Sequence, residues 1–538
     1  MIIGILRKML LPVVLYANFV ICSFTSVNAQ RNIDVLHYKY NIELNDNSDT
    51  IHGLAEIKVK FLAPSDELKL DLISPAQTGK GMRLGKILGP NVKRTLGVYT
   101  FFTIQFSNTF LPGDTATFVI PYSGIPEDGL IISRNKFGRR TFFSDNWPDR
   151  AHYWIPCNDD PSDKASVEFL VTAPDHYKVV SNGILQEEKE LPGNKKLSYW
   201  KEDIPLPTKI MVIGAADFAV DNIDTVDSVP VSSWVFAQNK MDGFKDYSIA
   251  PRILSFFIDY IGPFPYKKLA NVQSKTIFGG MENAGAIFYS ENSVDGKQDH
   301  ESLIAHEIVH QWFGDMATEK NFAHLWLSEG FATYLAHIYI ESKYGTDSLN
   351  TEMKNDRDEV IAFGKDDNQP VVDSVSPYMS LLNANSYQKG SWVLHMLRRQ
   401  LGDSIFHLGI KEYYAAYAGK NADTHDLQEV FKKVSGRDLS VFFKQWLYTA
   451  GNPSLDIKWK YSAPDKKISI TITQLQGNLF QFPLEIGLKS ASGKTKTETL
   501  FISNKTETFS LFVPDDIVQV IPDPATSLLF EASLEKIK

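Results

Sequence analysis

Two histidines four positions apart, followed by a more distant glutamate, are the side chains of this sequence best suited to bind a metal ion. His306, Glu307 and His310 form a His-Glu-x-x-His pattern, and Glu329 follows after eighteen further residues. Residues four apart on a helix share one face, so both imidazoles can reach one ion. Two histidines, a carboxylate and a water give zinc four ligands with one open position, as hydrolysis requires. The pattern predicts one Zn²⁺ held by His306, His310 and Glu329, with Glu307 as a proton acceptor.

The surrounding sequence predicts that these histidines are buried. Residues 303–313 are mostly apolar and leave little polar face for a solvated surface helix. Buried histidines need polar or metal partners. A second helical pattern begins near Leu325 and carries Glu329 in its first turns. Met316 stands where a metzincin would place a third histidine, which excludes that class.

Three motifs in the same order resemble those of a known family. The zinc pattern, with its eighteen-residue spacing, looks like that of the aminopeptidase N family of gluzincins, which includes the leukotriene hydrolase branch. Residues 387–390 resemble the segment that carries the family's catalytic tyrosine, here Tyr387. An upstream segment resembles the family's Gly-x-Met-Glu-Asn motif and consists of Gly279, Gly280, Met281, Glu282 and Asn283. The resemblance covers nearly all of the chain after its first thirty residues, and it implies a zinc-dependent aminopeptidase.

The resemblance also implies a role for each motif. Glu282 would bind the free α-amine of a peptide through a charge-assisted hydrogen bond. Gly279 and Gly280 leave the backbone bare, so a substrate can pair beside it like an added strand. Tyr387 would donate a hydrogen bond to the oxygen that becomes negative during attack, and Glu307 would act as general base. The expected partners are therefore peptides with a free N-terminus.

One position departs from the family pattern. Relatives place a second amine-binding Gln or Glu in a segment that corresponds here to residues 145–150, which contain neither. Asp145 or Asn146 can replace it, or Trp147 can line the pocket instead. Asp315, just after the zinc helix, is either a partner that orients a histidine or a solvated loop residue.

Three alternative functions remain open on the sequence. The spelling Gly-Gly-Met-Glu-Asn is close to the leukotriene branch, whose epoxide hydrolysis would be an added activity. An endopeptidase would use the same metal but would not bind the free α-amine of a peptide. A metal-free binding protein would use the β domains alone, although five matched polar groups at the zinc site argue against it.

The first 29 residues have the pattern of a secretory signal peptide. Arg7 and Lys8 precede an apolar run, and residues 27–29 fit a cleavage site with small side chains. Pro12 and Asn18 interrupt the run and argue against a permanent membrane anchor. We therefore expect an exported protein without a stable membrane span.

Composition excludes some partners. Removal of the signal peptide changes the formal net charge from −9 to −11, which argues against binding to nucleic acid. It also removes Cys22, so Cys157 alone remains and no intrachain disulfide can form. No sequence feature predicts an oligomeric state.

The periodicity of apolar residues changes twice along the chain. Alternation up to residue 228 predicts strands, and a polar stretch at 221–230 is the first candidate boundary. Beyond it we expect helices near 241–261, 299–313, 325–344 and 385–401, two shorter helices up to 449, and strands at 269–276 and 284–290. Alternation returns after residues 450–453. We therefore expect a multidomain α+β protein with a signal peptide (1–29), an N-terminal antiparallel β domain (30–228), a thermolysin-like α/β catalytic domain (229–450) and a C-terminal β-sandwich (451–538).

Overall fold

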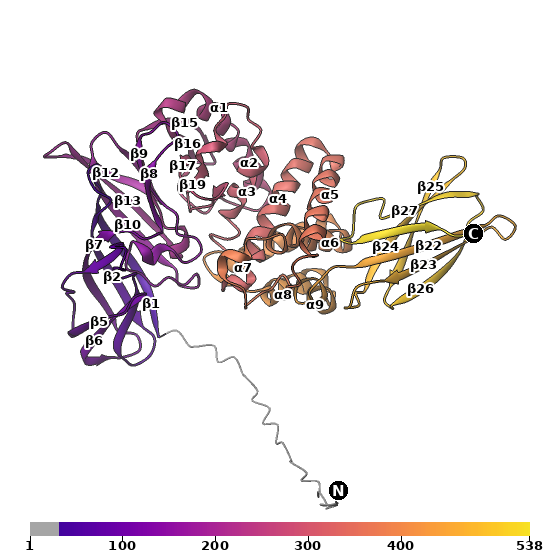
Figure 1. The fold of residues 1–538 in the computed structure, drawn as a ribbon, viewed down its shortest axis with the longest axis horizontal. Helices are drawn as coiled ribbons and strands as arrows, with labels where there is room; N and C mark the ends of the chain where they lie inside the picture. Colours follow the sequence, from indigo (N-terminus) through magenta and orange to yellow (C-terminus); the bar gives the residue numbers. More distant parts are fainter. Residues whose placement is uncertain (1–31) are drawn as a thin grey trace, which may run out of the picture.

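The chain folds into three regions that follow one another along the molecule, as Figure 1 shows. The structure is a computed structural model that describes residues 32–538. Strands build the N-terminal region, helices beside a small sheet build the central region, and strands return at the C-terminus. This architecture confirms the expected fold class. The signal peptide expected at residues 1–29 lies outside the described residues, and no helix within 32–538 has the length and apolar character needed to cross a bilayer.

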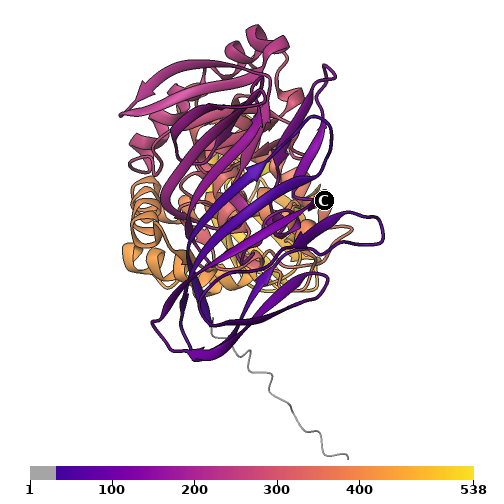
Figure 2. The ribbon, with the colours of Figure 1, turned by 90° about the vertical axis from the view of Figure 1, so that its left-hand side faces the viewer.

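A seven-stranded sheet with the order β12-β13-β10-β1-β2-β7-β4 dominates the N-terminal region. Its long strands run side by side across the face seen in Figure 2. Alternate residues of β1, among them Tyr38, Tyr40 and Ile42, are buried because successive side chains of a strand point to opposite faces. Neighbouring strands are antiparallel except for the parallel pair β1 and β10, a difference from the expected antiparallel domain.

Two smaller sheets, β11-β14-β9-β8 and β3-β6-β5, complete this region. The strands of the region are β1 (Ile33–Glu43), β2 (Ile51–Phe61), β3 (Ser65–Asp71), β4 (Gly81–Leu84), β5 (Val92–Gly97), β6 (Phe101–Phe110), β7 (Thr115–Ile125), β8 (Leu130–Arg134), β9 (Arg140–Ser144), β10 (Ala165–Pro174), β11 (Lys178–Ser181), β12 (Ile184–Leu191), β13 (Lys195–Leu206) and β14 (Ile213–Ala216).

A five-stranded sheet with the order β15-β16-β17-β19-β18 opens the central region. Its strands are β15 (Phe218–Val226), β16 (Val229–Phe236), β17 (Leu269–Ser274), β18 (Gly280–Met281) and β19 (Ala286–Ser290). β15 and β16 form a hairpin, and β16 runs parallel to β17. The boundary expected at residue 228 therefore falls inside this hairpin. Residues 221–230 resemble a linker because most of them are exposed at the hairpin end.

Helix α4 (Trp326–Tyr344) is the centre of the helical part. Every residue from Trp326 to Ile340 is buried, so the helix runs through the interior of the protein. It packs against α3 (Glu301–His310), α5 (Thr346–Phe363) and α6 (Gly390–Leu401). The sequence pattern does not predict α5, because only Leu349, Met353, Asp356 and Val360 of its residues are buried. The other helices are α1 (Lys240–Tyr247), α2 (Ala250–Tyr260), α7 (Asp403–Tyr417), α8 (Thr424–Ser435) and α9 (Ser440–Leu447).

Two sheets form the C-terminal region, with the strand orders β26-β23-β22-β28 and β25-β24-β27. On β23 the alternate residues Ile468, Ile470 and Ile472 are fully buried, as expected for a strand whose one face meets a second sheet. The strands are β22 (Ser454–Ser462), β23 (Lys467–Gln474), β24 (Phe482–Ser490), β25 (Thr495–Ile502), β26 (Thr506–Phe512), β27 (Ile517–Pro522) and β28 (Glu531–Lys536).

A buried ion pair joins the N-terminal region to the central one. Lys209 Nζ contacts the carboxylate of Glu319, and the two side chains are 1% and 0% exposed. Burial disfavours the ammonium, but the charges of Glu319 and Glu282 outweigh it and raise the pKa of Lys209 above its usual value. The pair fixes the N-terminal region close to the segment that follows the predicted zinc helix.

Replacement of Lys209 by methionine should destabilise the protein strongly, because it leaves the carboxylate of Glu319 buried without its counter-ion. Loss of one partner of a buried pair costs about 3–5 kcal/mol. We expect a lower midpoint of unfolding in urea. Lys201→Met, which removes a partly exposed lysine beside Asp203, is the matched control and should leave the midpoint nearly unchanged. Equal midpoints for the two variants would contradict the interpretation.

Candidate metal centre

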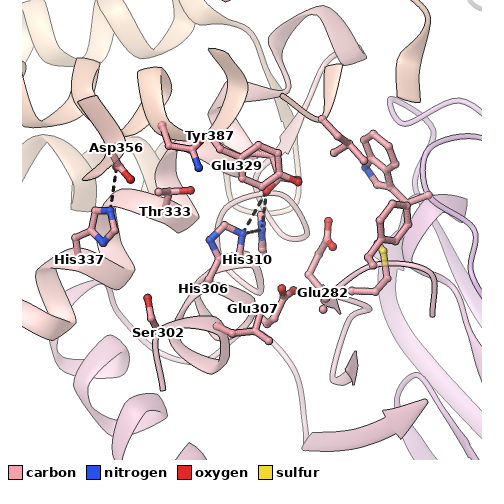
Figure 3. A pocket seen from close by; sticks show the side chains of 18 residues that line it. Glu282, Ser302, His306, Glu307, His310, Glu329, Thr333, His337, Asp356 and Tyr387 are labelled. Carbon is pink, nitrogen blue, oxygen red and sulfur yellow. Dashed lines mark hydrogen bonds and ion pairs between the residues drawn. The ribbon is translucent and has the colours of Figure 1, made fainter. Parts of the chain in front are cut away.

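The three predicted metal ligands come together between α3 and α4, as Figure 3 shows. The Nε2 atoms of His306 and His310 are 3.0 Å apart. Glu329 Oε2 lies 3.3 Å from the first and 3.2 Å from the second. Each of the three residues thus offers one ligand atom to a common point.

The spacing of these atoms fits a zinc ion. Zinc bonds to nitrogen and oxygen are about 2.0–2.2 Å long, which separates two ligands of a tetrahedron by roughly 3.3 Å. All three observed separations are close to this value. Among the described residues, no hydrogen bond satisfies the buried Oε2 atom of Glu329. The donor set and its geometry therefore suit a tetrahedral ion with one position left for water.

A backbone carbonyl orients the second histidine. His310 Nδ1 lies 3.1 Å from the carbonyl oxygen of Phe313, so the ring N–H at Nδ1 donates there and Nε2 keeps its lone pair for a metal. Gly314 leaves the necessary room, since a Cβ at this position would meet Ser328 Oγ at 2.3 Å and His310 Nδ1 at 3.0 Å.

Negative charge is concentrated around the ligands. Burial disfavours the cationic form of His310, but the charges of Glu329, Glu282 and Glu307 outweigh it and raise its pKa to about 10. Burial alone would raise the pKa of Glu329, yet the two histidines hold it well below its usual range. The negative charges that keep a proton on His310 also favour a bound metal cation.

Glu307 lies beside the ligands but is not one of the cluster. Its side chain lines the same pocket and is buried, and burial raises its pKa well above the usual value, helped by the charges of Glu282 and Glu329. Gly280 makes space for this carboxylate, because a Cβ there would meet Glu307 Oε1 at 2.1 Å. The structure therefore places a buried carboxylate next to the predicted metal position.

The Gly-Gly-Met-Glu-Asn motif forms the outer edge of the central sheet. Within it, β18 pairs antiparallel with β19, and its other edge faces the pocket. One oxygen or nitrogen atom from each of Glu282, Glu307 and His310 lies within 4.8 Å of the other two. Gly279, Gly280, Met281 and Glu282 line the pocket, whereas Asn283 does not.

A residue that sequence reasoning missed attaches this motif to the zinc helix. Gln311, directly after the second histidine, donates from Nε2 to the carbonyl oxygen of Glu282 (2.6 Å). Its Oε1 accepts from the N–H of Gly285 (2.7 Å). The side chain thus clamps both ends of the turn that carries Glu282. Its position after the His-Glu-x-x-His pattern was the only signal in the sequence.

Tyr387 lies over the first histidine. Its ring stacks on that of His306 with a centroid distance of 5.9 Å and an interplanar angle of 9°. It belongs to a π-helical turn, Asn385–Lys389, that leads into α6. Burial raises the pKa of Tyr387 well above its usual value, and the charges of Glu329 and Glu282 add to the effect, so the hydroxyl stays protonated and can donate.

Two glycines allow α4 and α6 to bring Glu329 and Tyr387 together. A Cβ on Gly330 would meet the Cα of Gly390 at 2.8 Å, and a Cβ on Gly390 would meet the Cα of Gly330 at 2.9 Å. Gly330 directly follows Glu329, and Gly390 is the last residue of the segment 387–390 that carries Tyr387. Direct backbone contact between the two helices therefore fixes their separation.

The pocket around the cluster holds about 480 Å³. Its lining includes the apolar side chains of Trp147, Phe278 and Met281, the last of which directly precedes Glu282 in the chain. Ser302, Thr333, His337 and Asp356 supply a polar wall on the opposite side of the histidines. A substrate that spans the cluster would therefore meet different surfaces on its two sides.

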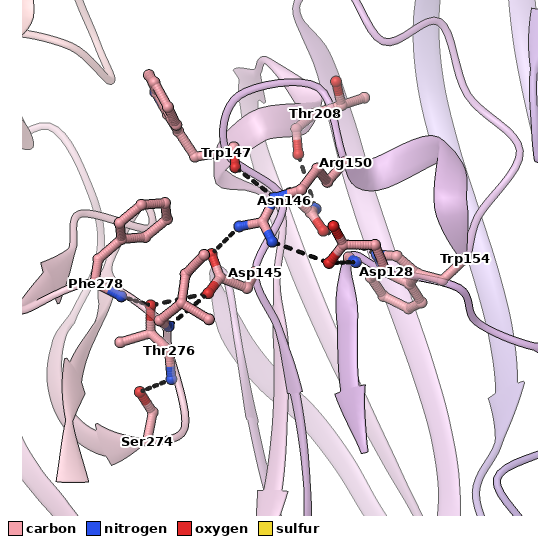
Figure 4. Close-up of polar contacts among 12 residues, drawn as sticks. Asp128, Asp145, Asn146, Trp147, Arg150, Trp154, Thr208, Ser274, Thr276 and Phe278 are labelled. Carbon is pink, nitrogen blue, oxygen red and sulfur yellow. Dashed lines mark hydrogen bonds and ion pairs between the residues drawn. The ribbon is translucent and has the colours of Figure 1, made fainter. Parts of the chain in front are cut away.

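Asn146 and Asp145, the two polar candidates for a second amine-binding residue, already make hydrogen bonds to other parts of the protein, as Figure 4 shows. Asn146 donates to the carbonyl oxygens of Thr208 (3.0 Å) and Met211 (2.6 Å) and accepts from Trp154 Nε1 (2.8 Å). Asp145 accepts hydrogen bonds from Arg150 Nη2 (2.8 Å), Thr276 Oγ1 (3.0 Å) and the N–H of Ile277 (3.0 Å). Both therefore hold the fold together, and Trp147 is the residue of this segment that lines the pocket.

Asp315 fits neither of the roles considered for it. It is 1% exposed, so it is not a solvated loop residue. Its carboxylate makes no hydrogen bond among the described residues, and Phe313 orients His310 instead. Burial raises the pKa of Asp315 well above its usual value.

Comparison with known proteins identifies the family. The model of the "Peptidase family M1 domain" matches residues 246–446, and that of the "Peptidase M1 N-terminal domain" matches residues 35–210. Together these ranges cover more than half of the sequence. The chain belongs to the M1 peptidase family, which confirms the resemblance seen in its motifs.

Several curated proteins are similar to parts of the chain. "Aminopeptidase M1" of Arabidopsis thaliana is 28% identical over 58% of this chain and 37% of its own length. "Probable aminopeptidase 2" of Sulfurisphaera tokodaii is 30% identical over 56% of this chain and 40% of its own length. "Aminopeptidase 2" of Candida albicans is 24% identical over 91% of this chain and 56% of its own length. The chain thus spans from about a third to a little over half of the length of these relatives.

Replacement of Gly390 by alanine should push α4 and α6 apart, because the added Cβ meets backbone rather than a movable side chain. Overpacking of this kind costs about 1–3 kcal/mol. We expect a lower midpoint of unfolding in urea. Gly97→Ala, where the added Cβ meets nothing within 4 Å, is the control and should change the free energy of unfolding by less than about 0.5 kcal/mol. Equal stability of the two variants would contradict the packing argument.

Proposed function

We propose that the protein is a zinc-dependent aminopeptidase that releases N-terminal residues from peptides. The observation that carries the proposal is the position of Glu282. Its carboxylate lies within 4.8 Å of ligand atoms of Glu307 and His310, and its Oε1 atom has no hydrogen-bond partner among the described residues. A peptide amine bound there brings the first peptide bond, and no later one, to the cluster of His306, His310 and Glu329.

One zinc ion is the cofactor that this cluster suits. A zinc ion held by His306, His310 and Glu329 would supply an activated water and a positive charge beside the scissile carbonyl. The separations of 3.0–3.3 Å between the ligand atoms support this assignment.

Glu307 moves the proton in this mechanism. It accepts a proton from the attacking water and passes it to the departing amine. Burial and the charges of Glu282 and Glu329 raise the pKa of Glu307 above its usual value, so this carboxylate holds a proton more tightly than an exposed one does. Gly280 leaves the room that the carboxylate itself occupies, because a Cβ there would meet Glu307 Oε1 at 2.1 Å.

Tyr387 and β18 hold the substrate in place. The protonated hydroxyl of Tyr387 donates to the carbonyl oxygen as that atom becomes negative. The free edge of β18 offers its backbone to an extended peptide, and the glycines at 279 and 280 let the two chains approach. Trp147, Phe278 and Met281 provide an apolar surface for the first side chain.

We also propose that the protein is exported. The basic and apolar segments of residues 1–29 support this proposal.

Two overlapping clusters are able to hold a metal, and mutation distinguishes them. The alternative cluster consists of Glu282, Glu307 and His310. We expect Glu307→Gln to retain one zinc per chain by elemental analysis while kcat falls by about 10² to 10⁴, the usual contribution of a general base. Glu329→Gln should lose the metal. Loss of zinc from Glu307→Gln and its retention in Glu329→Gln would assign the ligands to the alternative cluster.

The role of Glu282 is tested with paired peptides that differ only in N-acetylation. The wild-type protein should cleave the free peptide and leave the acetylated one intact. In Glu282→Gln the kcat/KM for the free peptide should fall by about 10 to 100-fold, because a charge-assisted hydrogen bond is lost. Zinc content should stay the same. Equal cleavage of both peptides by the wild-type protein would show an endopeptidase and refute the proposal.

A further inference from the structure

The polar wall of the pocket follows one face of α4 away from the metal ligands. Glu329, Thr333 and His337 are spaced four residues apart and all line the pocket. With a rise of about 1.5 Å per residue, Thr333 lies about 6 Å and His337 about 12 Å along the helix from Glu329. Ser302, one turn before His306 on α3, lines the same side. We call this side of the pocket the polar arm.

The polar arm points away from the proposed amine site. In Figure 3, Glu282 lies on one side of His306 and His310, and Thr333, His337 and Asp356 lie on the other. An extended chain advances about 3.3–3.6 Å per residue. A peptide anchored at Glu282 would therefore place the first residues after the scissile bond in the polar arm.

Two polar atoms in the arm have no partner among the described residues. They are Oγ1 of Thr333 and Nδ1 of His337, and the two residues are 8% and 6% exposed. Buried polar groups in native structures nearly always have a hydrogen-bond partner. Unsatisfied groups that line a cavity next to a reaction centre are therefore suited to bind a polar ligand.

The end of the arm carries an anion. Asp356 on α5 is 7% exposed, and its Oδ2 atom lies 3.0 Å from His337 Nε2, the one ion-pair partner it has within the described part of the chain. The neighbouring Arg357 is bound elsewhere, to Asp523 (2.7 Å) and the carbonyl oxygen of Leu528 (2.8 Å). No lysine or arginine is among the described residues that line the pocket. The arm thus offers a buried carboxylate without a full counter-charge.

We propose that the polar arm binds a cationic side chain of the departing peptide, with Asp356 as its counter-ion. The proposal rests on the proposed aminopeptidase function and adds a substrate class, namely peptides with lysine or arginine in the first two positions after the scissile bond. His337 orients the carboxylate through its Nε2 atom, and Thr333 supplies a hydroxyl to the bound chain. A carboxylate side chain in the same place would meet Asp356 and be disfavoured.

Three amidated tetrapeptides test this inference. They share their first and last residues and carry two lysines, two glutamines or two glutamates between them. For the wild-type protein, kcat/KM for release of the first residue should be about tenfold or more higher with lysine than with glutamine, and lowest with glutamate. Equal values, or a preference for glutamate, would refute the inference whether or not any variant folds.

Variants at Asp356 test whether its carboxylate causes the preference for lysine. In Asp356→Asn the ratio of the lysine to the glutamine peptide should fall close to one, and Asp356→Glu should retain a preference for lysine. Asp358→Asn removes the same charge from an exposed position on α5 and should keep the wild-type ratio. A preference for lysine that survives in Asp356→Asn would refute the role of Asp356.

A substrate without a second residue separates this inference from the proposed function. An aminoacyl-coumarin tests only the release of a first residue. If the wild-type protein cleaves it without any preference among the tetrapeptides, only the inference about the polar arm fails. If it cleaves neither the coumarin substrate nor any tetrapeptide, the proposed function fails as well, and the inference with it.

Discussion

The close contact between α3 and α4 is the constraint on which the rest of the site depends. It places the carboxylate of Glu329 within 3.3 Å of two imidazole nitrogens in an environment nearly closed to water. Such a carboxylate is stable only with positive charge beside it. The contact thus forms the proposed binding site for a divalent cation.

Glycines and one glutamine side chain around this contact fix the distances between the elements that carry the motifs. Gly330 and Gly390 set the distance between α4 and α6, and Gly280 sets the distance between β18 and Glu307. Gln311 attaches the turn that carries Glu282 to the helix that carries the histidines. Each device acts on the backbone of a motif, so the reactive side chains need few contacts of their own and remain free for a ligand.

The N-terminal region shapes the pocket from outside the central region. Asp145 accepts hydrogen bonds from Thr276 and Ile277, just before Gly279 and Gly280, and Lys209 pairs with Glu319 beyond the histidines. Trp147 enters the pocket from the same segment as Asp145. The lining of the pocket therefore comes from two regions, and the contacts between them help to set its form.

The sequence by itself determined the groups that share one helix or one strand. The positions of His306 and His310 follow from helical periodicity, and those of Gly280 and Glu282 follow from their place before a predicted strand, because such geometry is set within a few residues. Contacts between distant segments depended on the tertiary structure. The sequence allows Asn146 as an amine ligand, but in the folded protein its side chain donates hydrogen bonds to Thr208 and Met211 instead. The polar helix α5 gave too short an apolar stripe to be predicted, yet it brings Asp356 into the pocket. Packing joins residues that are tens of positions apart, and no local period encodes those distances.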